Sequence, residues 1–140
     1  MMRSDDLASA GAARGWMILA GVVLIAVGLL GFVSNPLVGP GDALIPTGTV
    51  HNLVHIVTGL LALYIAFGLR DIDQASGVIG FGLLYLVIFV VVLLSPTLFG
   101  LFDFAANVYL HVIHATLAVV SLALGYMARG ALRGPAGTRA

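Results

Sequence analysis

The chain has 140 residues, of which 61% are apolar and only 9% are charged, and its formal net charge is zero. Soluble domains usually carry about a quarter charged residues, so this composition excludes an ordinary soluble globular protein and indicates a membrane protein. No cysteine is present, which excludes disulfides, iron–sulfur clusters, thiolate zinc sites and covalently attached c-type haem.

Long apolar segments follow one another along the chain, at about residues 16–33, 50–69, 77–94 and 104–127. At about 1.5 Å rise per residue, each segment as a helix comes close to crossing the ~30 Å hydrocarbon layer of a bilayer. Their residues do not alternate in polarity as the strands of a membrane barrel do. The sequence therefore predicts an all-α bundle of four transmembrane helices over residues 14–129, with mobile tails at residues 1–13 and 130–140.

The predicted helices pair into two consecutive hairpins. Proline and glycine make the first loop, residues 34–49, irregular, and Pro96 ends the third helix because proline cannot continue the backbone ladder. A short polar turn, residues 70–74, joins the hairpins. The third segment has no ionisable group except the phenol of Tyr85, so we expect it to be the most lipid-exposed helix.

The arginines predict the orientation of the chain. They lie before the first predicted helix, in the second loop and after the fourth helix, as Arg3, Arg14, Arg70, Arg129, Arg133 and Arg139. Basic residues near helix ends stay on the cytoplasmic side of a membrane, so we expect both termini to be cytoplasmic. The arginines form no cluster of the kind that binds nucleic acid.

All four histidines lie near the start of just two predicted helices, the second and the fourth. Ionisable groups inside a bilayer are costly unless they find a partner, so by default they mark a functional position. Two trios have the same i, i+4, i+7 spacing at an offset of 56 residues: His51, His55 and Thr58, then Asn107, His111 and His114. At about 100° per residue each trio forms one narrow stripe on its helix.

The matched stripes predict that the two hairpins are parallel repeats about an axis along the membrane normal. A polar stripe that faces lipid would be costly. We therefore expect the two trios to face each other or a shared cavity, as one polar cluster in the outer halves of the second and fourth helices.

The segment His51-Asn52-Leu53-Val54-His55, followed by Gly59, resembles a family of small bacterial four-helix membrane proteins known only as a domain of unknown function. In that family an H-N-x-x-H-x-x-x-G segment opens the second helix and an N-x-x-(x)-H segment, here Asn107 to His111, opens the fourth. The spacing of the second segment is often one residue shorter in the family. The resemblance covers about residues 16–127 and implies the same topology in a bacterial inner membrane, with no established activity.

The first hypothesis for the histidines is structural. Neutral imidazoles would bond to Asn107, Thr58, loop carbonyls or water and hold the helices in register. The protein would then be a non-enzymatic accessory or structural membrane protein, with the lipid bilayer, a larger membrane complex or a second copy as its partner. Catalysis is less favoured, because no nucleophile or acid–base pair identifies a reaction.

The alternative hypotheses place a cofactor on the same histidines. His55 and His111, one from each of two helices, could ligate a b-type haem axially, as in bundle cytochromes. The four side chains of His51, His55, His111 and His114 could instead supply a four-nitrogen site for Zn²⁺ or Cu²⁺.

Overall fold

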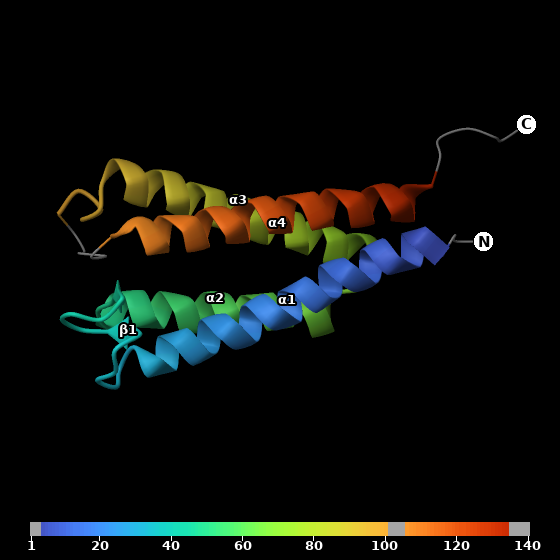
Figure 1. Ribbon diagram of the computed structural model, residues 1–140. Coiled ribbons are helices and arrows are strands. Elements are labelled where there is room, and N and C mark those ends of the chain that lie inside the picture. Colours follow the sequence, from blue (N-terminus) through green and yellow to red (C-terminus); the bar gives the residue numbers. More distant parts are fainter. Residues whose placement is uncertain (1–3, 101–105, 135–140) are drawn as a thin grey trace, which may run out of the picture.

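The computed structural model describes residues 4–100 and 106–134, and these form a bundle of long helices (Figure 1). The helices are α1 (Ser4–Leu30), α2 (Thr49–Gly68), α3 (Asp71–Leu94) and α4 (Val108–Arg133). Two short parallel strands, β1 (Val38–Gly39) and β2 (Ile45–Pro46), pair within the first loop. All four helices are long and apolar enough to cross a membrane, which confirms the predicted set of four long apolar helices.

The helix bounds differ from the expected ones at both ends of the bundle. α1 begins at Ser4, so most of the segment expected to be a mobile tail is helical. That segment is rich in alanine, the strongest helix former, and Asp5 lies near the positive end of the helix dipole. α4 likewise continues to Arg133, beyond the expected end near residue 127. Its expected start near residue 104 lies outside the described residues.

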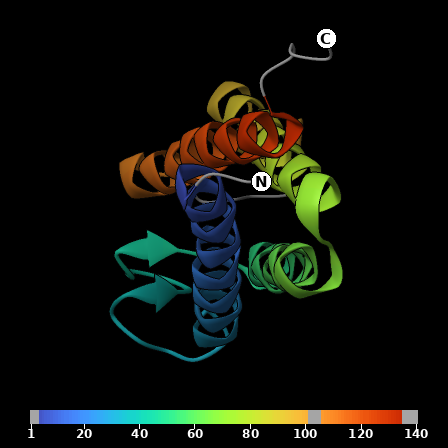
Figure 2. The same cartoon turned by 90° about the vertical axis from the view of Figure 1, so that its right-hand side faces the viewer.

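The two hairpins pack as two layers. α1 lies along α2 and α3 lies along α4, while α1 also packs against α4 and joins the layers (Figures 1 and 2). The indole Nε1 of Trp16 donates a hydrogen bond of 2.8 Å to Oγ of Ser121 at this contact. α2 and α4 lie diagonally across the bundle, so their backbones stay apart and contacts between them are made by side chains.

Glycines allow close approach within each hairpin. A Cβ atom at Gly21 would come within 2.9 Å of the Gly59 carbonyl oxygen, and one at Gly82 within 2.9 Å of the Leu122 backbone nitrogen. Only a residue without Cβ fits such contacts between helices. Gly80 differs, because a Cβ atom there would meet open space.

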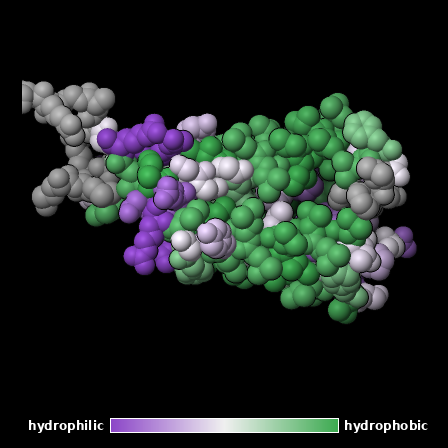
Figure 3. Space-filling model, turned by 180° about the vertical axis from the view of Figure 1, so that it is seen from behind, coloured by the Kyte–Doolittle hydropathy of each residue, from purple (hydrophilic) through white to green (hydrophobic). Residues whose placement is uncertain are grey.

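The outer surface of the bundle is apolar along most of its length (Figure 3). Large side chains such as Leu19, Val57 and Val119 are more than half exposed. Hydrophilic residues gather at the end that carries both termini (Figures 1 and 3). This distribution is the one that a bilayer requires, because lipid solvates apolar side chains and the polar residues lie where the spans end.

Candidate functional site

Three of the four histidines meet inside the bundle, towards the end opposite the termini. His51 and His55 come from α2 and His114 from α4, and one ring nitrogen of each lies within 4.8 Å of the other two. The ring centroids of His51 and His55 are 4.4 Å apart, and those of His51 and His114 are 6.4 Å apart. All three side chains are at most 3% exposed. We call these three residues the histidine triad.

The local sequence explains why two of the three triad residues lie together. Residues four apart lie on the same face of a helix, so His51 and His55 form one edge of α2 as predicted. Gly59, one turn further, lies against Gly21 and brings α2 close to α1. The third member, His114, comes from the other hairpin, so only the packing of the hairpins brings it to the triad.

The triad contains imidazole nitrogens without a hydrogen-bond partner. Neither ring nitrogen of His55 has a partner among the described residues, and the same holds for Nδ1 of His114. Buried polar side-chain atoms in folded proteins nearly always have a partner. Such nitrogens are therefore free to accept a ligand between the hairpins.

A small cavity lies at the triad. Its volume is about 10 Å³, and it is lined by His51, Val54, His55, Tyr85, Ile88 and His114. This is roughly the volume that one water molecule needs. The space between the rings therefore fits one small species, such as a single metal ion, and no larger group in this conformation.

Thr58, a predicted member of the cluster, bonds elsewhere. Its Oγ1 donates to the backbone carbonyl of Val54 at 2.8 Å and shares a hydrogen bond of 2.8 Å with the hydroxyl of Tyr85. A threonine in a helix readily bonds the carbonyl four residues before it. Thr58 therefore supports the wall of the cavity through Tyr85 and makes no bond to an imidazole.

Asn107 also differs from its predicted place. Its Oδ1 accepts a hydrogen bond of 3.1 Å from the Leu110 backbone N–H, and its amide donates to the Leu44 carbonyl at 2.9 Å. Asparagine is among the preferred residues at the position before a helix, because its side chain satisfies an otherwise unpaired N–H. Asn107 thus caps the start of α4 and links this helix to the first loop. Among the described residues it makes no hydrogen bond to a histidine.

His111 lies outside the triad. Its ring packs edge-on against Phe89 of α3, with centroids 6.1 Å apart, and it is only partly buried. The structure therefore brings together three of the four histidines predicted for a metal site. It does not bring His111 into a pair with His55, as the haem hypothesis requires.

Tyr85 belongs to the site, although the sequence analysis did not assign it there. It is 1% exposed, and its ring centroid lies 5.8 Å from that of His114. The sequence signal for a buried position is the single hydroxyl within an otherwise apolar segment. A tyrosine buried in a membrane has to bond its hydroxyl, so it favours the interior of the bundle.

The donor set determines which ligands fit. Among the described residues the group that could hold a metal contains only histidines. Asp42 is exposed in the first loop, and Asp103 lies outside the described residues. Imidazole nitrogens suit Zn²⁺, Cu²⁺, Ni²⁺ and iron, and three of them leave a further coordination position open.

The chain matches no protein-family model, no curated protein and no solved structure. The resemblance to the four-helix membrane family therefore stays a prediction. The site has to be interpreted from its own chemistry.

Proposed function

We propose that this chain is a multi-pass membrane protein that binds one divalent transition-metal ion, Zn²⁺ or Cu²⁺, through His51, His55 and His114. The observation that carries the proposal is the convergence of three buried ring nitrogens from two separate hairpins within 4.8 Å. We propose a binding protein and assign it no reaction.

The distances allow the ion to bind after a small adjustment. Zinc binds imidazole nitrogen at about 2.0–2.1 Å, so tetrahedral geometry separates two such nitrogens by about 3.4 Å. The ring nitrogens of the triad lie within 4.8 Å of one another and therefore have to draw together by at most about 1.4 Å. Histidine χ2 is a broad torsion, and ring rotation moves the nitrogens on this scale.

The unpaired nitrogens favour the metal over a purely structural cluster. Asn107 and Thr58, two of the partners that the structural hypothesis named for the imidazoles beside loop carbonyls and water, bond elsewhere. A buried polar group left without a partner costs about 1–3 kcal/mol. A bound ion would satisfy one of the unpaired nitrogens of His55 and would lower this cost.

The haem hypothesis has no comparable support. The cavity at the triad has a volume of about 10 Å³, so a porphyrin would have to push the hairpins apart. Its proposed axial ligand on α4, His111, packs against Phe89 instead.

Elemental analysis of the protein purified in detergent tests the proposal. After incubation with zinc or copper and removal of excess, we expect about one metal ion per chain. His55→Ala and His114→Ala should each abolish stoichiometric binding, whereas His111→Ala, a histidine of α4 outside the triad, should keep it. Unchanged metal content in the two triad variants would contradict the proposal. An absorption spectrum of the same sample tests for haem.

The structural role stays the second candidate, and the bond between Thr58 and Tyr85 favours it. This bond links α2 to α3 beside the triad without any ion. The two functions differ in thermal unfolding. A ligand that binds only the folded state stabilises it by RT ln(1 + [L]/Kd), so metal binding predicts a Tm that rises with zinc or copper. A structural cluster predicts no such rise.

We further propose that both termini are cytoplasmic and that the membrane is the bacterial inner membrane. Arg70 and Arg133 support the orientation, because they lie at the start of α3 and the end of α4, at the end of the bundle that carries the termini. Arg14 lies within α1, and its guanidinium group contacts Phe67 near the end of α2. The shared direction of α2 and α4 supports the proposal that the two hairpins are parallel repeats (Figure 1). A larger membrane complex or a second copy as partner stays a prediction.

A further inference from the structure

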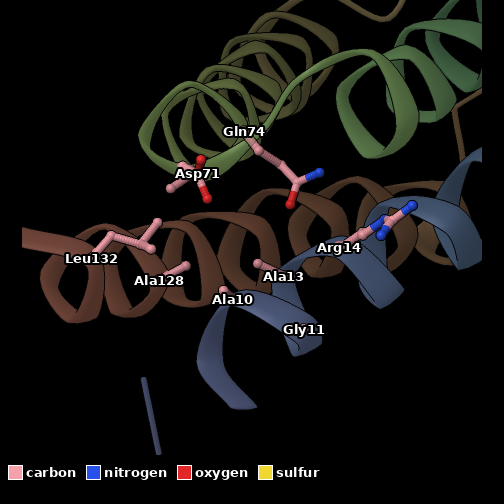
Figure 4. A pocket seen from close by; sticks show the side chains of 9 residues that line it. Ala10, Gly11, Ala13, Arg14, Asp71, Gln74, Ala128 and Leu132 are labelled. Carbon is pink, nitrogen blue, oxygen red and sulfur yellow. The ribbon is translucent and has the colours of Figure 1, made fainter. Parts of the chain in front are cut away.

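A hollow with two lobes lies at the end of the bundle opposite the triad. The lobes share three polar side chains, those of Arg14, Asp71 and Gln74. The first lobe, of about 210 Å³, is bounded by small side chains of α1 and α4 that include Ala13 and Ala128 (Figure 4). The second lobe, of about 360 Å³, lies against the end of α2.

The second lobe carries two arginines and one carboxylate, that of Asp71. Arg14 and Arg70 both line it, and the guanidinium carbon of Arg14 lies 5.4 Å from the centroid of the Phe67 ring. An arginine over an aromatic face is held by a cation–π interaction, which limits where its charge can move. Two guanidinium groups on one hollow favour an anion, and their planar donors match a phosphate.

Besides the Arg14 guanidinium group, the first lobe carries two acceptor side chains. The Nε2 atom of Gln74 donates to the backbone carbonyls of Ile65, Ala66 and Leu69 at 3.2, 2.9 and 3.1 Å. These bonds fix which way the amide faces. Figure 4 shows the Gln74 oxygen and the Asp71 carboxylate on the α3 wall of this lobe, opposite α1 and α4. No described donor bonds the Gln74 oxygen, and the structure shows no ion pair between the described side chains of Arg14 and Asp71.

We propose that this hollow binds the headgroup of a phosphoethanolamine lipid. The phosphate lies against Arg14 and Arg70, and the primary ammonium donates to Asp71 and the oxygen of Gln74. The position of the hollow favours a lipid, because the span of α2 ends at Gly68 and that of α3 begins at Asp71. Headgroups lie where spans end.

The positions of the arginines and of Asp71 in the hollow favour phosphoethanolamine over the phosphocholine and phosphoglycerol headgroups. A primary ammonium has three N–H donors and no acceptor, which matches a wall made of acceptors. The quaternary ammonium of phosphocholine has no N–H to donate. A phosphoglycerol headgroup carries the same phosphate but has no cation to pair with the Asp71 carboxylate.

Native mass spectrometry of the full chain released from nanodiscs tests the proposal. The nanodiscs contain equal amounts of phosphatidylethanolamine, phosphatidylcholine and phosphatidylglycerol. We expect the protein to retain phosphatidylethanolamine about tenfold over the other two, the ratio that one charge-assisted hydrogen bond can produce. In the wild type, stepwise N-methylation of the lipid amine should weaken retention at each step, and this comparison needs no variant.

Variants then locate the site. Arg14→Gln and Asp71→Asn should each remove the preference, while Arg133→Gln and Asp73→Asn, charged residues that line neither lobe, should keep it. Asp71 has a φ of +48°, and asparagine tolerates this left-handed conformation, so its variant should keep the backbone. Equal retention of the three lipids, or a preference that survives both variants of the hollow, would overturn the proposal.

Soluble O-phosphoethanolamine distinguishes a lipid from a free ligand with the same chemistry. Added at millimolar concentration, it should leave the retained lipid in place, because the acyl chains add apolar burial that the free headgroup lacks. If it binds in place of the lipid, the site belongs to a soluble amine phosphate and the lipid proposal is wrong.

Discussion

Thr58 of α2 and Tyr85 of α3 share a buried hydrogen bond of 2.8 Å between the two hairpins. Tyr85 also lines the cavity at the triad, so this bond connects the stability of the bundle to the shape of the site. Trp16 and Ser121 form another hydrogen bond between side chains of the two hairpins.

Tyr85→Phe should lower the free energy of unfolding by about 0.5–1.5 kcal/mol, because it removes one buried hydrogen bond and keeps the ring. Equilibrium unfolding in mixed SDS micelles measures the change. Tyr64→Phe is the matched control, because Tyr64 is 59% exposed and makes no hydrogen bond within the described residues. If the two variants have the same stability, the bond contributes nothing.

Gly82→Ala should destabilise the α3/α4 hairpin by about 1–3 kcal/mol, because the added methyl group meets the backbone of Leu122 and forces the helices apart. Gly80→Ala, two residues earlier on the same helix, should be neutral or stabilise by up to about 1 kcal/mol, because its methyl group meets open space. Thermal unfolding in detergent compares the two. A loss of stability in Gly80→Ala as large as in Gly82→Ala would contradict the packing described.

Substitutions at Asn107 should separate its two hydrogen bonds. Asn107→Asp keeps an oxygen for the Leu110 N–H but removes the donor to the Leu44 carbonyl, whereas Asn107→Ala removes both bonds. We expect the alanine variant to lose about 1 kcal/mol more than the aspartate variant, which is the usual value of a helix cap. Hydrogen exchange at the start of α4 reports the change locally. Equal protection in both variants would mean that the cap is without effect.

Metal binding by the triad should weaken on acidification. Protons and the metal compete for the same imidazole nitrogens, so affinity is full when the histidines are neutral and falls as pH decreases. We expect zinc bound at about pH 8 to be released progressively as the pH is lowered. Dialysis at a series of pH values followed by elemental analysis measures this. Retention that does not depend on pH would exclude imidazole ligands.

The chain contains no cysteine, so single cysteines can test its orientation. Asp42→Cys in the first loop should react with a membrane-impermeant maleimide in intact cells. Asp73→Cys, near the start of α3, should react only after the membrane is opened, because the arginine distribution predicts that this end is cytoplasmic. The reverse pattern of labelling would overturn the proposed topology. Labelling of both in intact cells would mean that the chain does not span the membrane as proposed.

Local chemistry, read along the chain, predicts the elements of this protein. Segments of about twenty apolar residues can cross a bilayer only as helices, because lipid offers no partner for an unpaired backbone. The same local reasoning places His51 and His55 on one face, since an α-helix returns to that face every four residues. These conclusions depend on residues close in sequence, and the structure agrees with them.

Tertiary packing alone determines which residues from outside α2 join the site. The matched trios predict equivalent partners on α2 and α4, yet the triad combines the first two residues of one trio with the last residue of the other, His114. Thr58, the counterpart of His114, bonds Tyr85 instead. The physical reason is that α2 and α4 lie diagonally. The close approach of α1 to α2 and of α3 to α4, set by glycine contacts between distant residues, determines which side chains meet in the middle.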